Sequence, residues 1–242
     1  MIVDVFAEGA TEEKVLQQLR KRVIPGLSYL PIDGKGKDQV NIQVARRLGQ
    51  KIEEHVAVRA LVMRDLDAHE GETEAGIVQS VRETLRRVIN VRISGATPFI
   101  EFVQHPEHPS VYTLELSRPD LRLALHIATY RWRDEFIKAT MDDYVLSLAV
   151  KPTTALTLIA QKKWPTTPAE VLRKVTIEIP GLLSNNGILL QEAKDFIRLY
   201  IAVIQDPSSP SVFAGKTLAN ANETDIRQVF ASLLAAIEFV GG

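Results

Sequence analysis

The chain has 242 residues, 45% of them hydrophobic, which is enough to bury the core of one large domain or two modest ones. With 29 basic and 30 acidic residues, it has no overall positive charge, so any binding to nucleic acid must be local. The absence of cysteine excludes disulfide frameworks, thiolate zinc sites and cysteine nucleophiles. No apolar run is long enough for a bilayer and no signal-peptide pattern opens the chain, so we expect a cytoplasmic protein without a membrane partner.

Short β-rich runs alternate with helical periodicities along the first half of the chain. Strands are predicted at residues 2–7, 27–32 and 57–63, and helices at residues 11–23, 38–55 and 73–88. Thr11 is the expected N-cap of the first helix. This alternation predicts an α/β fold with a mostly parallel sheet flanked by helices. Two later strands, at residues 98–104 and 111–117, are expected to add an antiparallel pair.

From Arg118 onward the pattern becomes helical, with proline, glycine, serine and asparagine between the helices. Helices are predicted at residues 121–130, 142–149, 153–160, 168–175, 187–204 and 223–239. We therefore predict an α/β core over residues 1–117 and a largely helical region over residues 118–242, which can pack with the core as one unit. The segment 207–215 is a candidate for a mobile connection.

The most informative residues are acids that directly follow two apolar strands. Glu8 follows the first strand, and Asp65 and Asp67 follow the third in the run Val-Met-Arg-Asp-Leu-Asp. Because the carboxyl ends of parallel strands gather at one edge of a sheet, we expect these three acids to meet there. Acids at the ends of buried strands must be paired, protonated or bound to a cation, and carboxylate oxygens suit Mg²⁺. The sequence therefore predicts a metal site.

These residues carry a family resemblance. Residues 6–12, Phe-Ala-Glu-Gly-Ala-Thr-Glu, resemble the Glu-Gly-x-Thr-Glu segment of Toprim domains in OLD-like nucleases and in related small Toprim groups. Asp65-Leu66-Asp67 resembles the Asp-x-Asp of the same domains, at a suitable separation and after a suitable apolar strand. The turn at residues 33–37 lies where such proteins often have a glycine-rich turn, and residues 141–146 are faintly similar to a segment that follows the core.

The resemblance covers residues 1–117 and implies a Toprim-like fold with Mg²⁺-dependent cleavage of DNA or RNA, or a related nucleotidyl reaction. The chain contains no Gly-x-x-x-x-Gly-Lys-Ser/Thr sequence, although OLD-like nucleases usually carry an ATPase domain. If the protein is a nuclease, it therefore acts alone or with a separate ATPase or other protein subunit. The sequence leaves the oligomeric state open.

The chemistry of the predicted site follows from its residue types. Asp65 and Asp67 would hold one or two Mg²⁺ ions, or Mn²⁺ in their place, through oxygen. Glu8 would complete the metal shell or act as a general acid or base. The nearby basic side chains would contact the nucleic-acid backbone as positive charges. These are Lys35, Lys37 and Arg64.

Each assignment has a structural alternative. Glu8 can serve the N-terminus of the next helix, and Asp65 and Asp67 can lie in a solvated loop. Glu70 or Glu72 can add a metal ligand, but we favour the alternative in which both, with Glu74, form a solvated approach to the next helix. Asp142 and Asp143 are expected to begin a helix. The spacing of the histidines at 69, 105 and 108 favours surface loops over a zinc site.

Two other functional classes remain open. The Asp-Leu-Asp triplet after an apolar strand is also typical of phosphotransfer enzymes that form an aspartyl phosphate, although His69 stands where threonine or valine is expected. The second alternative is a non-catalytic scaffold, derived from a Toprim domain, that binds a protein partner through its helical region.

Overall fold

The computed structural model describes residues 2–33, 36–92, 99–160 and 167–242. The chain divides into two compact units: the first contains residues 1–10, 26–129 and 231–242, and the second contains residues 11–25 and 130–230. These limits differ from the two predicted regions, because the last helix belongs to the first unit and most of the first helix to the second. No helix of the described residues has the length and apolar content to cross a membrane.

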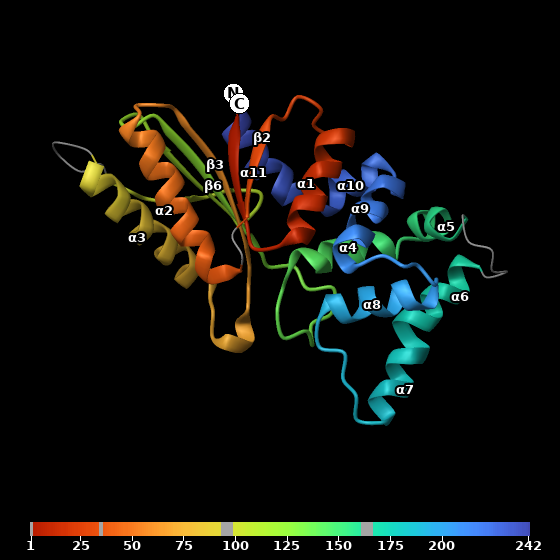
Figure 1. Cartoon of the computed structure of the whole chain (residues 1–242). Helices are drawn as coiled ribbons and strands as arrows, with labels where there is room; N and C mark the ends of the chain where they lie inside the picture. Colours follow the sequence, from red (N-terminus) through yellow and green to blue (C-terminus); the bar gives the residue numbers. More distant parts are fainter. Residues whose placement is uncertain (1, 34–35, 93–98, 161–166) are drawn as a thin grey trace. The chain divides into compact units, whose positions relative to one another are not determined.

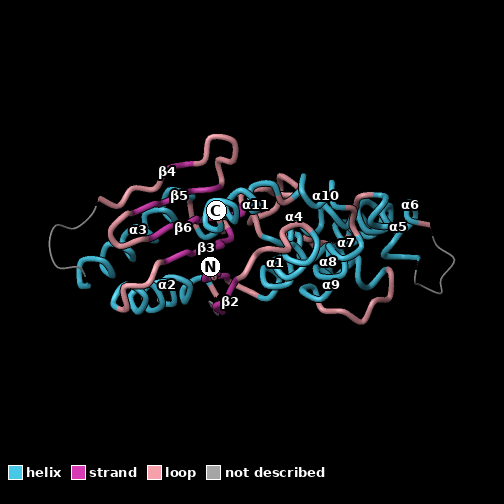
Figure 2. Tube along the Cα trace, turned by 90° about the horizontal axis from the view of Figure 1, so that it is seen from above, coloured by secondary structure: helices cyan, strands magenta, loops and turns pink. Residues whose placement is uncertain are grey.

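A six-stranded mixed sheet organises the first unit, with the strand order β2-β1-β3-β6-β5-β4 (Figure 2). The strands are β1 Val3–Ala7, β2 Tyr29–Asp33, β3 Val58–Asp65, β4 Val103–Gln104, β5 Val111–Leu116 and β6 Leu121–Ala128. Strands β2, β1, β3 and β6 run parallel, and β5 and β4 continue the sheet antiparallel. The predicted α/β class is confirmed, as is the antiparallel pair after the third strand. Residue 98 lies outside the described residues.

The predicted helix over residues 121–130 is wrong, because residues 121–128 form β6 in the interior of the sheet. β6 pairs with β3 along its whole length, from Leu121 opposite Val58 to Ala128 opposite Asp65. A strand covered on both faces is apolar at nearly every position and does not show the two-residue alternation of a half-exposed strand. A short run of this kind cannot be distinguished from a buried helix by periodicity.

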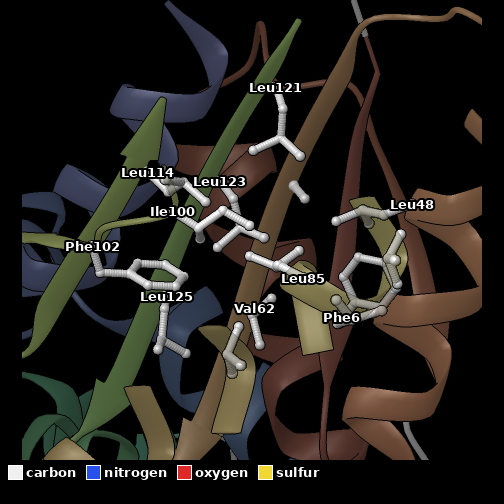
Figure 3. Packing of buried hydrophobic residues seen from close by; sticks show 14 of the residues in the cluster. Phe6, Leu48, Val62, Leu85, Ile100, Phe102, Leu114, Leu121, Leu123 and Leu125 are labelled. Carbon is white, nitrogen blue, oxygen red and sulfur yellow. The ribbon is translucent and has the colours of Figure 1, made fainter. Parts of the chain in front are cut away.

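Helices cover both faces of the sheet in the first unit. α2 (Lys37–Glu53) and α3 (Glu74–Arg92) lie on one face, and α11 (Ala231–Gly241) packs on β3, β5 and β6 from the other (Figure 1). A hydrophobic core lies under α2 and α3, where Phe6, Leu48, Val62, Leu85 and Leu123 pack together (Figure 3). Burying an aliphatic or aromatic side chain of this size contributes about 1.5–3 kcal/mol. This core fixes the strands whose ends carry the candidate acids.

The second unit is helical. Its helices are α1 Ala10–Arg22, α4 Met141–Ala149, α5 Pro152–Ala160, α6 Pro168–Arg173, α7 Ile179–Asn185, α8 Ala193–Val203, α9 Pro210–Asn220 and α10 Glu223–Val229. α4 is central, because every residue of it except Ser147 is buried and it packs against α5, α8, α9 and α10. A π-helical turn, Lys174–Glu178, joins α6 to α7.

Several predicted boundaries in this helical region change. The helix expected over residues 187–204 begins only at Ala193, and the one expected over 223–239 breaks at Phe230 into α10 and α11. Most of the proposed mobile segment at residues 207–215 is helical, because α9 begins at Pro210. Its start has a recognisable signal, because the Ser209 hydroxyl accepts from Val212 N and Pro210 takes the first helical position.

The structure contradicts the predicted helix start at Thr11 and confirms the one at Asp142 and Asp143. Thr11 is wrong as an N-cap, because α1 begins at Ala10 and the Thr11 hydroxyl donates to Asp142 Oδ1 at 3.1 Å. Asp142 and Asp143 lie in the first turn of α4, which confirms the predicted helix start. Asp143 completes a capping box with Thr140, accepting from its main-chain N at 2.9 Å and from its hydroxyl at 3.1 Å.

Candidate functional site

Glu8 and Asp65 lie at the same edge of the sheet in the first unit. β1 and β3 are parallel neighbours, with Phe6 opposite Val62, so their carboxyl ends lie side by side. Glu8 directly follows β1, and Asp65 is the last residue of β3. The Glu8 Oε1 atom accepts a hydrogen bond from the main-chain N of Asp65 at 3.3 Å. The structure therefore brings the Glu8 side chain to the beginning of the Asp-Leu-Asp triplet.

Arg64 connects two carboxylates at this edge. Its Nε donates to Glu8 Oε1 at 2.5 Å, and its Nη2 donates to Glu72 Oε1 at 3.0 Å. The Arg64 side chain is only 5% exposed, whereas those of Glu8 and Glu72 are 15% and 21% exposed. A buried arginine is stable only when carboxylates take up its charge and its N–H donors. Arg64 is thus a bridging cation between the end of β1 and the segment that precedes α3.

A short closed turn carries the second aspartate of the triplet. Asp67 precedes a single 3₁₀ turn, Ala68–Glu70, and its carbonyl accepts from the main-chain N of Glu70 and of Glu72, each at 3.2 Å. Gly71 ends the turn with φ +77°, a conformation in which glycine has no steric penalty. Glu72 closes the turn from the other side, because its Oε2 accepts from Asp67 N at 3.1 Å.

The structure corrects the favoured interpretation of Glu72. This residue is half-buried and bound to Arg64 and to the Asp67 main chain, so it is not part of a solvated approach to α3. Glu70 is exposed, as expected, and Glu74 begins α3, where its carboxylate accepts from the Tyr112 hydroxyl at 3.3 Å.

Burial sets the proton affinity of Glu8. Desolvation raises the pKa of Glu8 above its usual value, since the ionised carboxylate loses water, and the nearby negative charge of Glu72 adds to this rise. The Arg64 charge, its hydrogen bond and the N–H of Asp65 act in the opposite direction. The ionised form of Glu8 therefore depends on the cation beside it.

Gly36, the residue before α2, lies beside Glu8. The main-chain N of Gly36 donates to the Glu8 carbonyl at 3.1 Å, and Gly36 has φ +95°, which favours glycine. Lys37 is the first residue of α2, so it follows this contact directly. Lys35 lies outside the described residues.

The types of donor at this edge fit a hard cation, since carboxylate oxygens are the usual ligands of Mg²⁺. Asp65, Asp67 and Glu8 are the residues that would hold it. Among the described residues, no three histidine, cysteine, aspartate or glutamate side chains form a group arranged to hold a metal ion. In the arrangement seen here, the cation that neutralises Glu8 is the Arg64 guanidinium.

The sequence did not indicate the bridge from Arg64 to Glu72. The position of Arg64 in β3 could have indicated it. Residues two apart in a strand lie on the same face of the sheet, so Arg64 shares a face with Ala60 and Val62, two residues of the core under α2 and α3. A charged residue at a core-facing position needs a buried partner. The next acids along the chain, which include Glu72, were therefore candidates.

Comparisons with protein families, with curated proteins and with solved structures find no match for this chain.

Proposed function

We propose that the acidic edge of the first unit carries out Mg²⁺-dependent cleavage of nucleic-acid phosphodiesters, or a related nucleotidyl reaction, within a Toprim-like core. Glu8, Asp65 and Asp67 are the proposed metal-binding and catalytic residues. The observation that supports this proposal is the contact between the Glu8 carboxylate and the main chain of Asp65, at the carboxyl ends of adjacent parallel strands. Open α/β sheets bind ligands at this edge.

Each residue has a role in the proposal. A bound Mg²⁺ would polarise the phosphodiester and lower the pKa of a bound water. Glu8 would help to hold the ion or transfer a proton, and burial, which raises its pKa above the usual value, favours the proton-transfer role. Lys37, the first residue of α2, and Lys35, two positions before it in the sequence, would supply positive charge that attracts phosphate.

The partners remain predictions from the sequence. They are DNA or RNA as substrate, with a separate ATPase or other protein subunit as a further partner, in the cytoplasm. Exposed apolar side chains within and after the π-helical turn are consistent with a protein partner, and they belong to Ile177, Leu182, Ile188 and Leu189.

The test compares cleavage of DNA and of RNA by the wild-type chain, Asp65→Asn and a control, with Mg²⁺ and with EDTA. Asp65→Asn keeps the size of the side chain but loses its charge, so we expect cleavage to fall by at least about a hundredfold. Asp120→Asn is the matched control, because Asp120 precedes β6 at the opposite edge of the sheet and its side chain is 59% exposed.

Equal cleavage by all three proteins would assign the activity to another site or to a contaminant. Absence of both cleavage and Mg²⁺ binding in the wild type would favour the non-catalytic scaffold. The aspartyl-phosphate alternative is tested separately, by trapping a phosphoryl group on Asp65 or Asp67 with a phosphoryl donor.

A further inference from the structure

The Arg64 guanidinium lies at the centre of the acidic edge and is bound to it on two sides. Its Nε and Nη2 contact different glutamates, Glu8 and Glu72, and these belong to segments separated by more than sixty residues of sequence. Both glutamates also accept a main-chain N–H of the metal-binding segment, Glu8 from Asp65 and Glu72 from Asp67. Arg64 thus holds together the two acids that position the Asp-Leu-Asp triplet.

This arrangement satisfies one oxygen of Glu8 completely. Oε1 accepts from the Arg64 Nε and from the Asp65 N, so it has no remaining lone pair directed at a further cation. A Mg²⁺ ion that draws on the Glu8 carboxylate would also face the positive charge of the guanidinium at close range. The repulsion between these charges costs more in a half-buried site than in water.

We propose that Arg64 is a tethered counter-ion that competes with Mg²⁺ for the Glu8 carboxylate. Without the metal, Arg64 neutralises Glu8 and keeps the acidic edge assembled. When Mg²⁺ binds, the Nε of Arg64 leaves Glu8, while Nη2 keeps its contact with Glu72 and retains the side chain at the site. Arg64 is therefore a positioning residue that sets the Mg²⁺ concentration at which the site fills. This inference rests on the proposed metal site and assigns a regulator to it.

The proposal predicts that replacing the buried Arg64 strengthens Mg²⁺ binding instead of weakening it. Arg64→Gln removes the competing charge but keeps a hydrogen-bond donor, so Mg²⁺ should bind at least about fivefold more tightly than to the wild type. A residue that served only the structure would give the opposite result, because its loss would disorder the acids and weaken binding. The affinity is measured by isothermal titration calorimetry with Mg²⁺ alone, without a nucleic acid.

Arg59→Gln is the matched control. Arg59 lies in the same strand, five positions before Arg64, and its side chain is 11% exposed and paired with Asp120. We expect its loss to leave the Mg²⁺ affinity within about twofold of the wild type, because the charge is far along β3 from the acidic edge.

A second measurement uses only the wild-type protein, in case Arg64→Gln does not fold. The Nε–H resonance of Arg64 is followed by NMR during a Mg²⁺ titration, and it is expected to shift and to exchange faster with solvent as Nε leaves Glu8. A resonance that stays unchanged at saturating Mg²⁺ would overturn the proposal, as would equal or weaker binding by Arg64→Gln. Failure of every protein to bind Mg²⁺ would overturn both the metal site and this inference.

Discussion

Buried acidic side chains in the two units of the molecule are held by different partners, as a comparison of Asp4 and Glu8 in the first unit with Asp143 in the second shows. In the first unit, Asp4 lies 2.7 Å from Lys51 Nζ and 3.5 Å from Arg47 Nε, and Glu8 is held by Arg64. In the second unit, Asp143 accepts from the main-chain N of Trp132 and of Thr140, each at 2.9 Å, and from the Thr140 hydroxyl. Asp4 and Glu8 of the first unit thus depend on side-chain cations, and Asp143 of the second unit depends mainly on main-chain N–H donors.

This difference separates acids that can change partner from acids that cannot. A guanidinium or ammonium on a flexible side chain can move away and leave its carboxylate to another cation. The N–H groups around Asp143 belong to the main chain of Trp132 and of Thr140, the N-cap of α4, so they stay in place as long as this segment keeps its path. We therefore expect ligand binding at the acids of the first unit and mainly structural effects at Asp143.

The largest predicted effect concerns Asp4, which is completely buried in β1. Lys51→Met removes the nearer of its two cations and leaves a buried charge with only the more distant Arg47. We expect a loss of about 3–5 kcal/mol in the free energy of unfolding, measured by urea denaturation.

The double variant Asp4→Leu/Lys51→Met tests the reason for this loss. Replacing both members of a buried ion pair by apolar groups is often neutral, so we expect most of the stability to return. If the double variant were as unstable as Lys51→Met, the loss would come from the packing of the Lys51 side chain instead of from the unpaired charge.

The sequence predicts the parts of the fold that show a clear period. Helices α2 and α3 and strands β1 and β3 could be predicted because their apolar residues repeat at helical or strand spacing or lie beside glycine turns. β6 could not, because a strand buried on both faces has no alternation. α11 was predicted as part of a longer helix, but nothing local shows that it returns to the sheet.

The candidate site, like the fold, could be predicted from the sequence only in part. The parallel arrangement of β1 and β3 made it possible to predict that Glu8 and Asp65 lie at one edge. The bridge from Arg64 to Glu72 depends on the path of the turn at residues 67–72, which is set by tertiary hydrogen bonds. Whether these acids hold Mg²⁺ is a prediction that the proposed experiments test.

The second prediction concerns a buried base of the first unit, His126, instead of a buried acid. His126 of β6 is completely buried, and its Nε2 lies 3.0 Å from Ser232 Oγ. Burial lowers the pKa of His126 to about 4, and the charge of His108 adds to this effect. As the pH falls from the usual histidine value of 6.5 toward about 4, the unfolded chain binds a proton here and the folded chain does not.

Acid should therefore destabilise the wild type through this residue by up to about 3 kcal/mol. His126→Gln should remove this contribution, so that its free energy of unfolding falls less than that of the wild type between neutral and acid pH. His69→Gln is the control, because His69 is exposed, and it should keep the wild-type dependence. Identical slopes for the wild type and His126→Gln would show that His126 is protonated in the folded protein.

The smallest of the three effects concerns the backbone-bound acid of the second unit. Asp143→Ala leaves the main-chain N of Trp132 and of Thr140 without their acceptor, so we expect the free energy of unfolding to fall by about 2 kcal/mol. Asp65→Ala, at the carboxyl end of β3, should cost less than about 1 kcal/mol. An equal loss for both variants would remove the distinction between exchangeable and fixed partners.

The pH dependence of the stability lost in Asp143→Ala gives a second test of the role of Asp143. Burial raises the pKa of Asp143 from 3.8 to about 6, although the N–H and hydroxyl donors act against this rise. The folded protein thus holds a proton on Asp143 at pH values where the unfolded chain has lost it. The contribution of Asp143 is fully present below pH 3.8 and declines as the pH rises through about 6. The difference between wild type and Asp143→Ala should therefore shrink from acid to neutral pH, opposite in direction to the contribution of His126.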